Sequence, residues 1–299
     1  MDPKLRLGYA LGLLVTIAYS VWYIGLNLLS SFSNGAYSPV LPLFLIELIS
    51  ALIVLAMALT RQNKKILGFD PRYSILAGVI FAAANYMFFV TISSSGIPFA
   101  GSFATAEIVV FSFLLWASSK TKRVVGFYVL GAALIAAGLI IESFKLGGGA
   151  VDLNATLVEY GTGFAVLYGL AAFFYYISLE KTKDTLGTML GVQGTQTALF
   201  LSLLCFYFGS ITLPSLSLYY IVIVIGVAIA LFLSFFGETV MVEILIPFGR
   251  SAVSTGYILA SLQLIPVLIY SLAINPGEWV SYTPGIALIV MGSVFLQWK

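Results

Sequence analysis

The sequence contains no histidine and only one cysteine, Cys205, among its 299 residues. Without histidine the chain has no imidazole for a metal site or a proton relay, and one thiol cannot form an internal disulfide. The sequence also has no cluster of aspartates and no glycine-rich phosphate loop followed by lysine. These absences argue against an enzyme and against ATP-driven transport, and we expect no cofactor and no bound metal.

Charge is scarce as well, because Asp, Glu, Lys and Arg together make up 9% of the residues. A soluble domain carries about 25%. The hydrophobic share is 61%, which is more apolar surface than a soluble globule of this length could bury. A lipid bilayer must therefore act as the solvent, and the net charge of +2 gives no reason to expect a nucleic-acid partner.

Ten apolar runs are long enough, at about 20 residues, to cross the hydrocarbon core as helices. The connections between them are mostly short and rich in Gly, Ser, Pro and Asn, which end helices. The first run is too long for the apolar part of a cleavable signal peptide. The sequence predicts an all-α membrane protein with ten transmembrane helices, at 7–29, 40–60, 74–94, 99–118, 124–142, 161–179, 186–208, 217–237, 251–273 and 281–298.

Basic residues are distributed unevenly over the connections. If the N-terminus is cytoplasmic, 13 of the 14 Lys and Arg residues fall on the cytoplasmic side, and only Lys145 falls outside. An excess of Lys and Arg in cytoplasmic loops is typical of polytopic membrane proteins. We therefore expect both termini in the cytoplasm.

The two halves of the chain carry similar segments in the same order. Ile97–Ser102 returns as Ile246–Ser251, and Gly131–Gly138 returns as Gly285–Gly292, in both cases about 150 residues later. The expected first and sixth helices match in the same way, through Gly8 and Gly161 at their starts and through Trp22-Tyr23-Ile24 against Tyr175-Tyr176-Ile177.

This repetition predicts two five-helix halves, 1–142 and 161–299, joined by an extracytoplasmic linker at 143–160 that contains three consecutive glycines. Because five is odd, the second half enters the membrane from the opposite side, so the repeat is inverted. Many secondary transporters are built from inverted repeats that enclose a site at their seam.

The pattern resembles the drug/metabolite transporter superfamily, and specifically its EamA-type branch. The resemblance covers nearly the whole chain and includes the Leu7–Gly12 opening, the Arg123–Gly138 stretch after a basic loop, and Pro266 in the ninth helix. The chain differs from many of these relatives at Glu107, where they have a nearby proline. The resemblance implies transport of small solutes and a multi-pass location in the plasma (cell inner) membrane.

Two glutamates lie inside apolar runs, Glu47 in the second and Glu107 in the fourth. An ionised side chain at the bilayer centre costs roughly 2.5–3.5 kcal/mol on insertion scales, so such residues usually face a cavity or a partner. Each could carry a proton, receive a cationic solute, or donate a structural hydrogen bond from a protonated carboxyl. Four other glutamates are expected at helix ends or in loops, as ordinary solvated carboxylates: Glu142, Glu180, Glu238 and Glu243.

Amides and aromatics complete the candidate binding residues. Amides offer both hydrogen-bond donors and acceptors to a polar solute, and the faces of Trp and Tyr attract organic cations. The same residues could equally serve as contacts between helices or as packing. The candidates are Asn85, Gln193, Gln196 and Gln263 among the amides, and Tyr19, Trp22, Tyr23, Tyr168 and Tyr175 among the aromatics.

The function predicted from these features is secondary active transport, as an exporter or exchanger, of a small organic solute such as an amino acid, amine or drug-like metabolite. Alternating access would use a central cavity between the two repeats, and the carboxylates would serve proton coupling or amine recognition. Phosphorylated solutes are disfavoured because they need Arg or Lys in the site. Two halves on one chain can enclose a site alone, so we expect a monomer. The alternative is a non-transporting structural or signalling membrane subunit.

Overall fold

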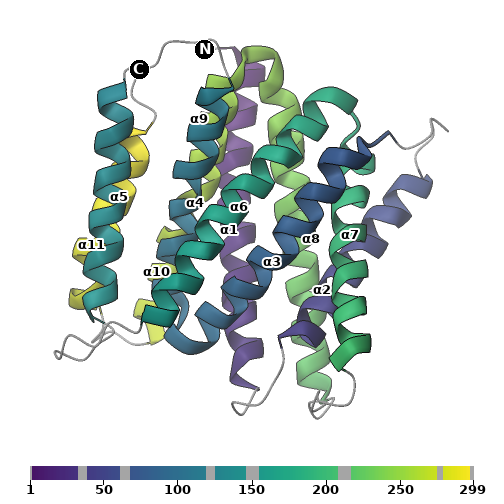
Figure 1. Cartoon of the computed structure of the whole chain (residues 1–299), viewed down its shortest axis with the longest axis horizontal. Helices are drawn as coiled ribbons and strands as arrows, with labels where there is room; N and C mark the ends of the chain where they lie inside the picture. Colours follow the sequence, from purple (N-terminus) through teal and green to yellow (C-terminus); the bar gives the residue numbers. More distant parts are fainter. Residues whose placement is uncertain are drawn as a thin grey trace.

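The computed structural model describes residues 2–32, 39–60, 68–118, 125–145, 155–207, 217–274 and 279–296. Within these ranges nearly every residue is helical and none lies in a strand. The expectation of an all-α protein is therefore confirmed (Figure 1). Of the expected linker at 143–160, residues 146–154 lie outside the described residues, while 143–145 and 155–160 are helical.

The helices follow one another along the chain with short connections. In order they are α1 (Pro3–Ser31), α2 (Val40–Thr60), α3 (Pro71–Ser95), α4 (Ile97–Ala117), α5 (Val125–Lys145), α6 (Ala155–Thr182), α7 (Thr185–Tyr207), α8 (Leu218–Leu245), the short η2 (Ile246–Phe248), α9 (Arg250–Ala260), the short η3 (Ser261–Gln263), α10 (Leu264–Ile274) and α11 (Trp279–Phe295).

Eight helical segments of the described chain are long and apolar enough to cross a membrane: α1 to α4, α6, α7, α8 with η2, and the α9–η3–α10 segment. Two further apolar helices, α5 and α11, contain shorter apolar stretches. The chain is therefore a multi-pass membrane protein. Helix α8 continues past the expected end at residue 237 to Leu245, which carries Glu238 into the bundle.

The sequence explains where several helices begin and turn. Asp2 and Asp70 cap α1 and α3 with their side chains and are each followed by proline, which suits the first helical position. Gly96, which follows α3, has a φ of 80°, and Gly249, which precedes α9, has a φ of 89°. Residues with a side chain rarely adopt such a φ. The two glycines therefore allow α4 to turn back sharply from α3, and α9 from α8.

Helices from distant parts of the sequence form the main packing pairs. Helix α1 packs on α8, α3 on α6, α2 on α7, and α5 on α11. Figure 1 shows the α5–α11 pair at one edge of the bundle, and the start of α1 and the end of α11 at the same end of it. Most of the buried side chains form one continuous apolar core that joins these pairs.

Glycines bring α5 and α11 into backbone contact. Gly131 faces Gly292, and Gly138 faces Gly285, so that the carbonyl oxygen of one glycine lies where a Cβ on the other would be. Small residues at such positions allow membrane helices to approach closely, and the contact is made by van der Waals packing.

The α9–η3–α10 segment is an interrupted helix. Three residues of 3-10 helix, ending at Gln263, separate α9 from α10 just before Pro266, which has no N–H to donate. Helix α1 binds the carbonyls of this region, because the hydroxyl of Thr16 donates to Leu259 O at 2.6 Å and that of Ser20 donates to Gln263 O at 3.0 Å. Hydroxyls of neighbouring helices commonly stabilise such interruptions within membranes.

Candidate functional site

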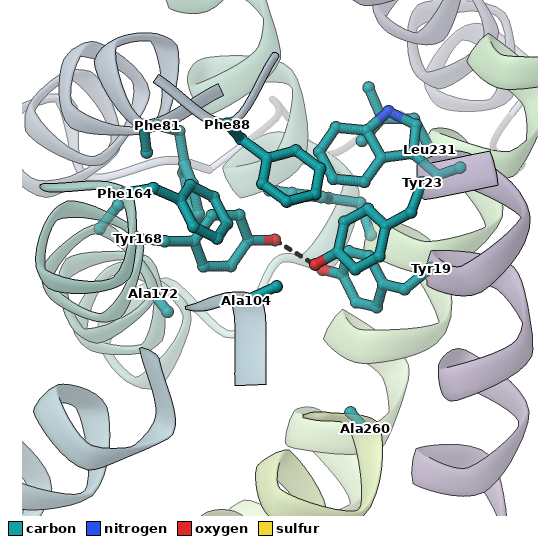
Figure 2. Close-up of a cluster of buried hydrophobic side chains, with 14 of the residues drawn as sticks. Tyr19, Tyr23, Phe81, Phe88, Ala104, Phe164, Tyr168, Ala172, Leu231 and Ala260 are labelled. Atoms are coloured by element: carbon teal, nitrogen blue, oxygen red, sulfur yellow. Dashed lines mark hydrogen bonds between the residues drawn. The ribbon is translucent and has the colours of Figure 1, made fainter. Parts of the chain in front are cut away.

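A chain of hydroxyl and carboxyl groups crosses the middle of the bundle. Tyr168 on α6 donates a hydrogen bond to the Tyr19 hydroxyl at 3.0 Å, and Tyr19 on α1 donates to Glu238 on α8. Figure 2 shows the two tyrosine hydroxyls meeting from opposite helices. All three side chains are buried, with 4% or less of their surface exposed. Three helices from both halves of the sequence therefore meet at one polar centre.

Glu107 on α4 belongs to the same centre. Its carboxyl interacts electrostatically with that of Glu238, and both carboxyls interact with the hydroxyls of Tyr23 and Tyr168. Tyr257 on α9 also faces Glu238. The Oε2 atom of Glu107 is buried and accepts no hydrogen bond from the described protein groups. We call these residues, with Tyr19, the carboxyl–phenol centre.

Gln263, at the helix interruption, connects to this centre through Tyr23. Its Nε2 donates to the Tyr23 hydroxyl at 2.8 Å, while its buried Oε1 accepts no hydrogen bond from described groups. Trp22 lies beside Tyr23, with ring centroids 5.0 Å apart, and stacks on Phe88 at 5.6 Å. The interruption between α9 and α10 thus borders the centre directly.

Aromatic rings surround the carboxyl–phenol centre on the α3 and α6 side. Phe88 and Phe164 have centroids 4.6 Å apart, and Phe81 contacts Tyr168 edge-on at 4.8 Å. The labelled rings of Figure 2 form this wall around the Tyr19–Tyr168 pair. Tyr175, further along α6, hydrogen-bonds with Thr239, the residue after Glu238. The wall consists of π-faces and hydroxyls, which suits an organic cation or an aromatic solute.

Four of the remaining candidates form a second polar network, between α2, α3 and α7. Asn85 Nδ2 donates to Glu47 Oε1 at 3.1 Å and to Gln196 Oε1 at 3.0 Å. One turn away, Gln193 Nε2 donates to the hydroxyl of Ser50 at 2.8 Å. All five side chains are buried. The structure therefore divides the eleven predicted binding residues between two places: Glu47, Asn85, Gln193 and Gln196 in this network, and the others in or beside the carboxyl–phenol centre.

The expectation for Glu238 and Glu142 is wrong. Both were expected as solvated carboxylates at helix ends, but Glu238 is 2% exposed and Glu142 is fully buried in α5 against Gly285. Glu238 was missed because the apolar run was ended at 237, although Val240, Met241 and Val242 continue it. Its spacing of about 150 residues from Asn85, which matches the offset of the repeats, is the signal that could have found it.

Basic side chains in the described residues are confined to the ends of helices and the turns between them. Arg250, at the start of α9, pairs with Glu180 at 3.3 Å and donates to the carbonyl oxygen of Ser118 at 2.6 Å. Glu180 is therefore at a helix end, as expected. No group of three or more His, Cys, Asp or Glu side chains in the described part of the chain could hold a metal ion. The carboxyl–phenol centre thus has two acids and no basic counterpart among these residues.

Comparisons with known proteins extend the fold assignment but name no function. No family model matches the sequence, and no curated protein matches it. A solved structure, described only as a crystal structure of a protein, is similar with a TM-score of 0.68. The two sequences are 16% identical, and the match covers 97% of each chain. This similarity extends over the whole fold, and at this identity it says nothing of the solute or the activity.

Proposed function

We propose that this protein is a secondary active transporter of small organic cations, such as amines or the ammonium group of amino acids. The observation that carries the proposal is that Glu107 on α4 and Glu238 on α8 lie close enough to interact electrostatically, at a centre with four tyrosines and, among the described residues, no Lys or Arg. Unpaired buried acids are costly in a membrane, and they usually mark a solute or ion pathway.

The chemistry of the carboxyl–phenol centre favours a solute that brings hydrogen-bond donors and positive charge. Glu107 Oε2 and Gln263 Oε1 are both acceptors that receive no hydrogen bond from described groups. An ammonium group could donate to both carboxyls, while its organic part would contact the ring faces of Tyr23 and Tyr168. A proton could replace the ammonium on one carboxyl, which would make proton exchange the coupling reaction. A phosphorylated solute would instead be repelled by the acids.

The architecture supports a ten-span reading with inverted repeats. If the shorter α5 and α11 also span the membrane, each half has five spans, with α9–η3–α10 as one of them. The packing pairs then exchange under a two-fold operation that relates the halves: α1–α8 corresponds to α6–α3, while α2–α7 and α5–α11 each correspond to themselves. This arrangement, with halves near 1–142 and 161–299, is what the resemblance to the EamA-type drug/metabolite transporters implies.

Two features support alternating access between the halves. The interruption at Gln263 borders the carboxyl–phenol centre and gives the α9–α10 segment a place to bend. At one end of the bundle, Arg250 on α9 binds Glu180 on α6 and Ser118 at the end of α4, so it links the halves. Breaking this link would allow that end to open. The exporter-or-exchanger direction and a cytoplasmic position of the termini remain part of the proposal.

The test is uptake of radiolabelled solutes into proteoliposomes that contain the purified protein, with an imposed pH gradient. The panel contains primary aromatic amines, amino acids and sugar phosphates. We expect uptake of amines that is lost in Glu107→Gln and Glu238→Gln. The matched control is Glu243→Gln, on the same helix as Glu238 but exposed, where it accepts a hydrogen bond from Thr185.

Amine uptake that persists in both centre variants would overturn the assignment of the site. If the wild type neither binds nor moves any member of the panel, the alternative of a non-transporting membrane subunit gains weight. Amines that bind without uptake would place the chain with membrane receptors for the same solutes.

A further inference from the structure

The polar network between α2, α3 and α7 is separate from the carboxyl–phenol centre. Its members are Glu47, Ser50, Asn85, Gln193 and Gln196, each 3% exposed or less. Among the described residues, no hydrogen bond joins this network to the tyrosines or acids of the centre. The uptake of a solute at the centre does not account for it.

The network has a definite register between two antiparallel helices. Glu47 and Ser50 lie one turn apart on α2, and Gln196 and Gln193 lie one turn apart on α7. Ser50 bonds to Gln193, and Asn85 on α3 bridges Glu47 and Gln196. The four side chains of α2 and α7 therefore face one another in two layers. Such an arrangement holds its polar atoms at fixed positions.

Three oxygen atoms of this network accept no hydrogen bond from the described protein groups: Glu47 Oε2, Asn85 Oδ1 and Gln193 Oε1. The amide nitrogen of Asn85 donates to both Glu47 and Gln196, and its Oδ1 is left without a hydrogen bond. A buried acceptor without a partner has lost its hydration and gained no hydrogen bond in return, which is unfavourable. Three of them on three adjacent helices call for a ligand that oxygens can bind.

We propose that these residues form a binding site for a sodium ion. The available ligand atoms are carboxylate, amide and hydroxyl oxygens, which are the ligands that hard cations prefer. One carboxylate neutralises one positive charge, so a monovalent ion leaves the buried site neutral and a divalent ion does not. The hydrogen bonds from Asn85 to Glu47 and to Gln196, at 3.1 and 3.0 Å, hold the side chains of α2, α3 and α7 in direct contact. Because such contact leaves little room between the helices, we assign the smaller Na⁺ rather than K⁺.

A proton at Glu47 would not satisfy the whole network. A protonated carboxyl donates a single hydrogen bond, so at least one of the amide oxygens of Asn85 and Gln193 would still lack a partner. A sodium ion can bind several oxygens at once. A proton and a sodium ion carry the same charge, so the number of oxygen ligands is the better reason to prefer sodium here.

The proposal is tested by equilibrium binding of ²²Na⁺ to the purified full-length protein in detergent, without any organic solute, in choline chloride at constant ionic strength. We expect saturable binding of one ion per chain that unlabelled NaCl displaces and that KCl displaces at least tenfold less well. Glu47→Gln should weaken binding at least tenfold, because it keeps an acceptor for Asn85 but removes the charge. The exposed Glu243→Gln should leave binding unchanged.

Gln193→Leu provides a second variant, since it removes an amide oxygen and leaves the carboxylate and the bridge through Asn85 in place. We expect severalfold weaker ²²Na⁺ binding with an unchanged elution volume on size exclusion. Absence of saturable binding to the wild type, or equal affinity in Glu47→Gln and the wild type, would overturn the site. Because ²²Na⁺ binding is measured without transport, this failure is distinguishable from a failure of amine uptake.

Discussion

The glycine contact between α5 and α11 makes a stability prediction that can be worked from distances. A Cβ at Gly138 would lie 2.5 Å from the carbonyl oxygen of Gly285, and ordinary contact begins at 3.4 Å. The obstacle is backbone, which cannot rotate away as a side chain can. Gly138→Ala therefore forces the two helices apart by up to about 0.9 Å, and overpacking of this kind typically costs about 1–3 kcal/mol.

The measurement needs a control for helix propensity, because alanine is favoured over glycine in a helix by about 1 kcal/mol. Gly226→Ala in α8 provides it, since a Cβ there has nothing within 4 Å. The difference between the two variants isolates the overpacking. At roughly 2–4 °C per kcal/mol, the thermal midpoint of Gly138→Ala should lie about 2–12 °C below that of Gly226→Ala, measured by intrinsic fluorescence in detergent.

A double variant sharpens the test. Gly131→Ala meets the Gly292 oxygen at 2.7 Å, so the same separation of the helices relieves both clashes. Gly131→Ala combined with Gly138→Ala should therefore cost less than the sum of the single variants, as expected for changes that share one interface. Equal midpoints for Gly138→Ala and Gly226→Ala would refute the backbone contact between α5 and α11.

Three further perturbations follow from contacts described above. Tyr19→Phe removes the hydroxyl that donates to Glu238. Because hydrogen bonds to charged groups contribute about 1.5–3 kcal/mol, amine uptake should fall roughly 10- to 100-fold. The exposed Tyr219→Phe should leave uptake unchanged. Pro266→Ala restores a backbone donor beside the helix interruption, so the thermal midpoint should rise while uptake falls, and unchanged uptake would argue against bending there. Arg250→Gln breaks a partly exposed ion pair, so the free energy of unfolding should change by less than about 1 kcal/mol while the rate of solute exchange changes. A large loss of stability would contradict this.

The sequence predicted the helical fold well because apolar runs separated by Gly, Pro and Asn leave little choice within a bilayer. It located the helix that bears Glu238 but placed its end too early, at 237. Hydropathy alone places an acidic residue near the membrane surface. The burial of Glu238 is compensated by its tertiary partners, above all Tyr19, which the sequence does not show. The same reasoning missed Glu142.

The division of the candidate residues into two places was not visible in the sequence. Glu47 and Glu107 lie at similar expected depths in their helices, and nothing along the chain distinguishes a residue that faces α7 from one that faces α8. Packing decides this: Glu47 accepts a hydrogen bond from Asn85 on α3, while Glu107 lies close enough to Glu238 on α8 to interact with it electrostatically. Side-chain polarity identified most of the members, and the packing of helices assigned them to their partners.

The stacking of Trp22 on Phe88 has an optical consequence. Trp22 is 1% exposed, its ring lies 16° from parallel to that of Phe88, and it packs beside Tyr23 at the edge of the carboxyl–phenol centre. The chain has four tryptophans, so a background with phenylalanine at Trp116, Trp279 and Trp298 would leave one emitter in this wall. Its fluorescence would then record, in real time and without any attached dye, each rearrangement of the rings that line the centre.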